Sequence, residues 1–194
     1  MHRTFSMCLD AAVAAVVLVI PFLLLDRYCF HNKKRTACYL VLAVYLSGVF
    51  AVVGLPDIRY IRFEPNFNFV PFRYMVSDHS TKLNVLLFLP LGFFLPVLWE
   101  NFKKLHWTIL FGFCTSLLIE VLQIFTFRAT DVNDLMTNTF GTFLGWCFGR
   151  VLRWLGPSVR PSENTKEVYA VCGVTFAVMF FVHPFLADWR WMYF

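Results

Sequence analysis

The chain has 194 residues, of which 59% are hydrophobic and 24 are phenylalanine, and its formal net charge is +5. That apolar content is far above that of ordinary water-soluble domains, so the composition excludes them. The basic residues lie between apolar runs rather than in one patch. This pattern is typical of membrane topology signals and argues against a nucleic-acid partner.

Six apolar runs are long enough to be membrane spans, because about 20 helical residues cross the hydrocarbon core. They lie at about residues 8–25, 37–55, 83–99, 107–127, 132–153 and 168–187. Backbone groups inside lipid must find partners within their own segment, so each span is predicted to be a helix. The sequence therefore predicts an all-α integral membrane protein with one membrane domain at 1–194. It is a bundle of six transmembrane helices, or of five if the 168–187 run does not span.

The first and third runs each carry a feature that affects their interpretation. Residues Leu9 to Leu25 resemble a secretory signal peptide, but no small-residue cleavage site follows them, so we expect a retained span. The third run contains Pro90 and Pro96, which predict a kink or a shortened helix.

The basic residues also predict the orientation in the membrane. Counted on alternate sides of the six spans, Lys and Arg number ten on one face and seven on the other. Four of the ten lie in the short loop at residues 26–36. Because basic residues accumulate in cytoplasmic loops, we expect that face to be cytoplasmic and both termini to lie outside.

The connection at residues 56–82, between the second and third spans, is the one long loop. Its centre, residues 66–72, is apolar and aromatic but too short to span a membrane. We expect an interfacial or partly re-entrant segment in which Asn68, Pro71 and Phe72 take part. The loop is a candidate lid or ledge for a ligand, or else a connector that follows the membrane surface.

The fourth and fifth runs carry small and polar residues at helical spacing. Each set shares one helix face: Gly112, Ser116, Glu120 and Gln123 in the fourth run, and Asp134, Asn138, Gly141, Gly145 and Gly149 in the fifth. The glycine series permits close approach between helices. A short turn makes the two helices antiparallel neighbours, so we expect their polar faces to meet.

Ionisable groups in or beside membrane spans are costly and usually functional. Glu120 precedes Arg128 by about 12 Å of helix rise, and Asn84 lies at a similar depth. We therefore expect an outer-leaflet polar pocket that binds a ligand. Its predicted members are Asn84, Glu120, Gln123, Arg128, Asp131, Asp134 and Asn138.

Several chemistries are open to this pocket. Arg128 suits a phosphate or carboxylate group. Asp131 and Asp134 offer the oxygen ligands of Mg²⁺ or Ca²⁺, but no recognised metal motif is present, so we expect no cofactor and keep a divalent cation as the alternative. Glu120 is the candidate catalytic base, although no nucleophile accompanies it. Alternatively, Arg128 pairs with an aspartate, and Gln123 and Asn138 join the helices.

Five sequence blocks together resemble the VanZ-like family over about residues 40–150. They are Asn68-Phe69-Val70-Pro71-Phe72, the segment from Asn84 to Phe93, Ser116-Leu117-Leu118-Ile119-Glu120-Val121-Leu122-Gln123, Arg128, and the segment from Asp131 to Gly141. Residues 156–194, with the last apolar run, extend beyond the usual core. The resemblance implies a multi-pass protein of the bacterial cytoplasmic membrane. The family's namesake is associated with low-level resistance to the glycopeptide teicoplanin, without altered D-Ala-D-Lac precursors.

Three functions remain open at this stage. In the favoured one, which is not enzymatic, the outer-face pocket binds a lipid headgroup or lipoglycopeptide and contributes to teicoplanin resistance or envelope homeostasis. In the second, an intramembrane enzyme acts on a lipid-linked phosphate or sugar with Glu120 as general base. In the third, the polar cluster joins the helices of a structural scaffold. Expected partners are membrane lipids, with a lipid-linked cell-envelope precursor or a lipoglycopeptide antibiotic as ligand; the oligomeric state is left open.

Overall fold

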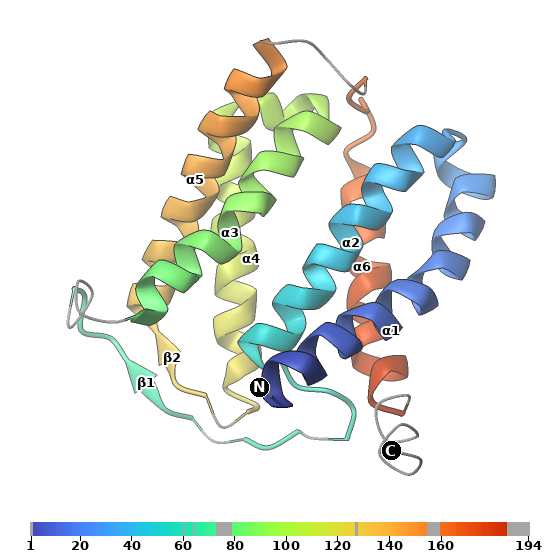
Figure 1. The fold of residues 1–194 in the computed structure, drawn as a ribbon. Coiled ribbons are helices and arrows are strands. Elements are labelled where there is room, and N and C mark those ends of the chain that lie inside the picture. The colour runs from blue at the N-terminus through green and yellow to red at the C-terminus, as the bar shows by residue number, and fades with distance from the viewer. Residues whose placement is uncertain are drawn as a thin grey trace. The chain divides into compact units, whose positions relative to one another are not determined.

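The computed structural model describes residues 2–59, 61–63, 65–72, 79–126, 128–154 and 160–185. These residues are mostly helical, which confirms the predicted helical character (Figure 1). The helices are α1 (His2–Leu25), α2 (Lys33–Val53), α3 (His79–Leu98), α4 (Leu105–Gln123), α5 (Val132–Trp154) and α6 (Lys166–Ala177). Short helical turns adjoin them at η1 (Asp26–Phe30), η2 (Glu100–Lys103) and η3 (Val178–Val182), and two short strands are β1 (Phe67–Asn68) and β2 (Thr130–Asp131).

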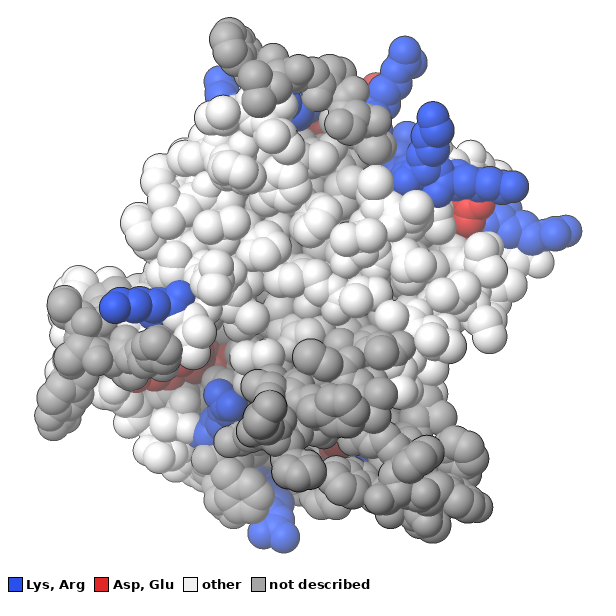
Figure 2. All heavy atoms as spheres, viewed as in Figure 1, with Lys and Arg blue, Asp and Glu red and all other residues white. Residues whose placement is uncertain are grey.

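Four helices of the described chain are long and apolar enough to cross a membrane. They are Lys33–Val53, Thr81–Leu98, Leu105–Gln123 and Lys166–Phe185. The last combines α6 and η3. The view in Figure 2 agrees, because most of the described surface on that face is uncharged. Spans at α1 and α5 stay a prediction.

The observed α5 and α3 can be compared with the fifth and third spans that the sequence predicts. α5 has 23 residues but carries Asp134, Asn138 and Arg153, which lower its apolar character. α3 runs as one 20-residue helix through Pro90 and Pro96, so the third span is not shortened.

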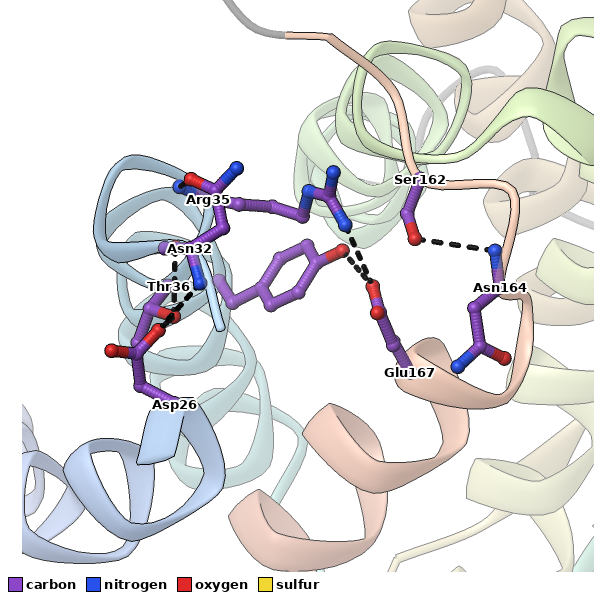
Figure 3. Close-up of polar contacts among 8 residues, drawn as sticks. Asp26, Asn32, Arg35, Thr36, Ser162, Asn164 and Glu167 are labelled. Atoms are coloured by element: carbon purple, nitrogen blue, oxygen red, sulfur yellow. Dashed lines mark hydrogen bonds and ion pairs between the residues drawn. The ribbon is translucent and has the colours of Figure 1, made fainter. Parts of the chain in front are cut away.

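The described chain forms two compact units, residues 1–61 with 166–194, and residues 62–165. In the first unit, α2 packs on α1 and on α6. Tyr39 of α2 is fully buried, and its hydroxyl donates a hydrogen bond to Glu167 of α6 at 2.5 Å. Arg35 approaches the same carboxylate at 3.7 Å (Figure 3). α6, which follows the core predicted at residues 40–150, is thus joined to α2 by a buried polar contact.

In the second unit, α3 and α5 run parallel with their backbones in direct contact. A Cβ on Gly145 would collide with the carbonyl oxygen of Leu89, and one on Gly92 with the carbonyl oxygen of Thr142. A Cβ on Gly112 of α4 would collide with the side chain of Thr142, so α4 also packs closely on α5. The glycine series of α5 therefore permits close approach, as predicted, and its partner is α3.

The long loop of the second unit is paired with the turn between α4 and α5. β1 pairs in parallel with β2, with Phe67 opposite Thr130 and Asn68 opposite Asp131. Earlier in the loop, the backbone N–H of Arg62 donates to the carbonyl oxygen of Phe125 at 3.0 Å. The loop is therefore tied to the end of α4 and to the start of α5.

Candidate functional site

Glu120 is the buried carboxylate of the site. It lies in the last turn of α4 and is 4% exposed. Its Oε2 accepts a hydrogen bond from the backbone N–H of Asp131 at 2.9 Å, and its backbone carbonyl accepts one from Thr130 Oγ1 at 3.0 Å. The last carbonyls of a helix have no partner within it, so Thr130 satisfies a group that the helix leaves open. Glu120 thus joins the end of α4 to β2.

Asp131 directs both carboxylate oxygens at neighbouring amides. Oδ1 accepts from the backbone N–H of Asn133 at 2.8 Å and from Asn133 Nδ2 at 2.9 Å. Oδ2 accepts from Asn68 Nδ2 at 2.9 Å. The first of these bonds caps the start of α5, a preferred role of aspartate at a helix N-terminus. The divalent cation considered for Asp131 and Asp134 finds no group of three His, Cys, Asp or Glu side chains among the described residues.

Asn133 was missing from the predicted site, yet its side chain makes two hydrogen bonds to the backbone of the loop. Its side chain is 5% exposed. Its Nδ2 donates to the carbonyl oxygen of Val70 at 3.2 Å, and its Oδ1 accepts from the backbone N–H of Phe72 at 2.7 Å. Phe72 has φ 61°, an uncommon conformation for a residue with a side chain. Asn133 therefore fixes the backbone of the loop at residues 68–72, one of the sequence blocks that resemble the family.

The same contacts leave the apolar side chains of the loop outside. Phe69 is 70% exposed and Phe72 is 68% exposed. The rings of Phe67 and Phe69 stack with centroids 5.4 Å apart. We call the exposed side chains of Phe67, Phe69, Val70 and Phe72 the aromatic ledge.

Asn138 and Ser116 join the two polar helix faces at a deeper level. Both are buried, and Asn138 Nδ2 donates to Ser116 Oγ at 2.9 Å. This bond brings the faces of α4 and α5 together as expected. The amide oxygen of Asn138 has no hydrogen-bond partner in the described chain.

Asn84 of α3 has a similar open position. Its buried Nδ2 finds no hydrogen-bond partner among the described residues. Asn84 directly precedes Val85, whose carbonyl oxygen lies against Gly141 of α5, and Asn138 precedes Gly141 by one helical turn. Asn84 and Asn138 therefore lie toward the same end of the α3–α5 contact, one with a spare donor and the other with a spare acceptor.

The remaining predicted residues differ in burial. Gln123 is buried in the last turn of α4, whereas Arg128 is exposed in the following turn. Asp134 is half-buried in the first turn of α5. Glu120, Asp131 and Asp134 thus belong to the segment where α4 ends and α5 begins, although they do not form a metal-binding group.

A model of the VanZ/LLP1 family matches residues 36–153. The chain belongs to this family. It is also 39% identical to Protein VanZ of Enterococcus faecium over 125 residues, which are 62% of this chain and 72% of that protein. No solved structure matches. We call the polar residues described above the polar cluster: Asn84, Ser116, Glu120, Gln123, Arg128, Asp131, Asn133, Asp134 and Asn138. The family match includes all of them and the aromatic ledge, while α1 and α6 lie outside it.

Proposed function

We propose that this member of the VanZ/LLP1 family binds an amphipathic envelope molecule, a lipid headgroup or a lipoglycopeptide, where α4 ends and α5 begins. The observation that carries the proposal is the position of the aromatic ledge. Asp131 binds the side-chain amide of Asn68, and Asn133 binds the loop backbone at Val70 and Phe72. Both contacts lie beside buried Glu120, and the aromatic side chains of the loop are exposed. A ligand with a polar head and an acyl chain would find matching surfaces on both sides of these contacts.

The polar side of the site suits a ligand rich in hydroxyl or amine groups. Carboxylates accept hydrogen bonds from both, and Arg128 offers a guanidinium to an anionic group. Asn84 has a spare donor and Asn138 a spare acceptor. A hydroxyl group can satisfy one of each kind because it both accepts and donates. Sugars of a lipoglycopeptide or of a lipid-linked headgroup have this chemistry.

The proposed setting is the bacterial cytoplasmic membrane, crossed by six helices. The four long apolar helices support a multi-pass protein, and α1 and α5 would supply the other two spans. The cluster of Lys and Arg at residues 26–36 favours a cytoplasmic position for that loop. With alternating spans, the polar cluster then faces outside, and the aromatic ledge lies at the lipid–water interface.

Family membership and the similarity to Protein VanZ support a contribution to low-level teicoplanin resistance or to envelope homeostasis. Teicoplanin carries an acyl chain, so it can meet the protein at the outer surface of the cytoplasmic membrane. In this proposal the protein binds its ligand without converting it.

The test is teicoplanin susceptibility of a host that expresses the protein, scored together with its abundance in the membrane. Glu120→Gln and Arg128→Ala are expected to abolish protection at normal abundance. Glu163→Gln and Arg160→Ala make the same chemical changes at exposed positions and should leave protection intact. Full protection by both site variants would overturn the proposed site.

A structural role is the competing function, and the contacts of Asp131 favour it. Both of its carboxylate oxygens already accept hydrogen bonds from the protein. If the cluster only joins the helices, Asp134→Ala and Asn138→Ala will lower the membrane abundance and protection in proportion. If abundance stays normal while protection falls, the cluster does more than stabilise the fold.

A further inference from the structure

A groove between α1 and α2 lies within the first unit, and none of its residues is part of the proposed ligand site. Its volume is about 350 Å³, within the range of small-molecule pockets, about 300–1,000 Å³. Val19 and Leu23 of α1 and Ala37 and Leu40 of α2 form apolar walls, and Lys33 lies at one end. Val19 and Leu23 are 38% and 63% exposed, so the groove is open along its side.

The acidic residue at this end of the groove is already engaged by the turn. Asp26 Oδ1 accepts a hydrogen bond from Thr36 Oγ1 at 2.6 Å and another from the backbone N–H of Asn32 at 3.1 Å (Figure 3). Asn32 in turn caps the start of α2 by accepting from the N–H of Arg35. The carboxylate therefore serves the α1–α2 turn.

The cations of the turn exceed this one acid. Arg27, Lys33 and Lys34 are exposed and form no ion pair within the described chain, while Arg35 approaches Glu167. An apolar groove that ends among unpaired cations matches the two parts of an anionic phospholipid. Basic sites between transmembrane helices on the cytoplasmic side bind such headgroups.

We propose that the groove binds one acyl chain of an anionic phospholipid from the bilayer, with the lipid phosphate against Lys33. The charge complementarity separates this occupant from a zwitterionic lipid, which would fill the apolar walls equally well but gain less at Lys33, because its ammonium group offsets the charge of its phosphate. The bound lipid would lie between α1 and α2, where it would add apolar contacts to both helices.

The experiment uses the purified full-length protein in detergent and native mass spectrometry. Dioleoylphosphatidylglycerol and dioleoylphosphatidylcholine serve as probes because they differ only in the headgroup. Wild type is expected to retain the anionic lipid preferentially. Lys33→Gln should weaken its binding about fivefold, the effect of one basic side chain near a membrane surface. Binding of phosphatidylcholine should weaken less, because its choline group already offsets the phosphate charge. Lys34→Gln, with the same charge change outside the groove lining, should have the smaller effect on the anionic lipid.

A second pair of variants tests the groove itself. Ala37→Trp fills the groove and should reduce binding of the anionic lipid, whereas Val41→Trp, one turn further along α2 and exposed, should not. A melting curve for each variant checks that it is folded. Equal binding of the two lipids by wild type would overturn the proposal, as would unchanged binding in Lys33→Gln, which keeps the groove intact.

Discussion

The buried carboxylate of Glu120 and the backbone N–H of Asp131 form a hydrogen bond of 2.9 Å across 11 residues of chain. This bond closes the turn between α4 and α5. It also places Asp131 where its side chain can bind Asn68 and cap α5. The carboxylate that we propose as part of the ligand site is therefore also part of the architecture that positions the site.

This dual role predicts different outcomes for two substitutions of Glu120. Glu120→Gln keeps an acceptor oxygen for the N–H of Asp131 and should preserve stability. Glu120→Ala leaves that N–H without its partner. The cost for a fully buried group is about 1–3 kcal/mol, and this bond is part-buried, so a loss at the lower end of that range is expected. Thermal unfolding of the purified protein in detergent measures both, with Glu163→Ala as an exposed control. Equal melting temperatures for the Gln and Ala variants would contradict a structural contribution of the bond.

Asn133→Ala should release the aromatic ledge while the helices stay intact. The substitution removes the acceptor for the N–H of Phe72 and the donor to the carbonyl of Val70. Faster hydrogen exchange is expected at residues 67–72, because opening of the loop no longer has to break these two hydrogen bonds and therefore costs less free energy. Asn101→Ala removes a hydrogen bond to Thr165 elsewhere in the same unit and is the matched control. Unchanged exchange in the Asn133 variant would show that strand pairing alone fixes the loop.

Two glycines of the chain should respond oppositely to alanine. Gly145→Ala places a methyl group against the carbonyl of Leu89, and overpacking of this kind costs about 1–3 kcal/mol. A methyl group on Gly173 of α6 would meet nothing within 4 Å, so Gly173→Ala should stabilise by up to about 1 kcal/mol through helix propensity. Melting temperatures of the two variants decide the matter. A Gly145 variant as stable as wild type would mean that α3 and α5 can separate at little cost.

The contact between α2 and α6 can be tested by a double-mutant cycle. Tyr39→Phe removes the donor to buried Glu167 and should destabilise by about 1–3 kcal/mol. If the two groups act through this bond, Tyr39→Phe and Glu167→Ala together should cost less than the sum of the single changes, because each single change already removes it. Tyr28→Phe, at a position 71% exposed, controls for loss of a hydroxyl. Strict additivity would argue against the bond.

The sequence predicted the helices and the meeting of the polar faces because helical periodicity is a local property of the chain. The contact between Ser116 and Asn138 could be expected in this way, since each residue lies on the polar helix face that the spacing predicts. Asn133 was not predicted as a site residue, because its partners Val70 and Phe72 are more than 60 residues away in a loop without periodicity. The glycine spacing of α5 likewise indicated a close neighbour but contained no information on which helix it is.

Asp131 illustrates a different limit. A carboxylate beside apolar runs has the same appearance in a sequence whether it binds a cation or caps a helix. The choice depends on which N–H groups face it, and here they come from Asn68 and Asn133. The number of spans has a similar limit, because the polar residues that make α5 interesting also reduce its apolar character.

The buried bond between Tyr39 and Glu167 has a consequence for how the chain can be divided. The family match ends at residue 153, whereas α2 packs on α1 and α6, which lie before and after the matched region. A fragment trimmed to residues 36–153 would keep Tyr39 and lose the carboxylate that its hydroxyl binds. The segment that sequence comparison marks as the domain is therefore shorter than the segment that must be expressed for α2 to keep its neighbours.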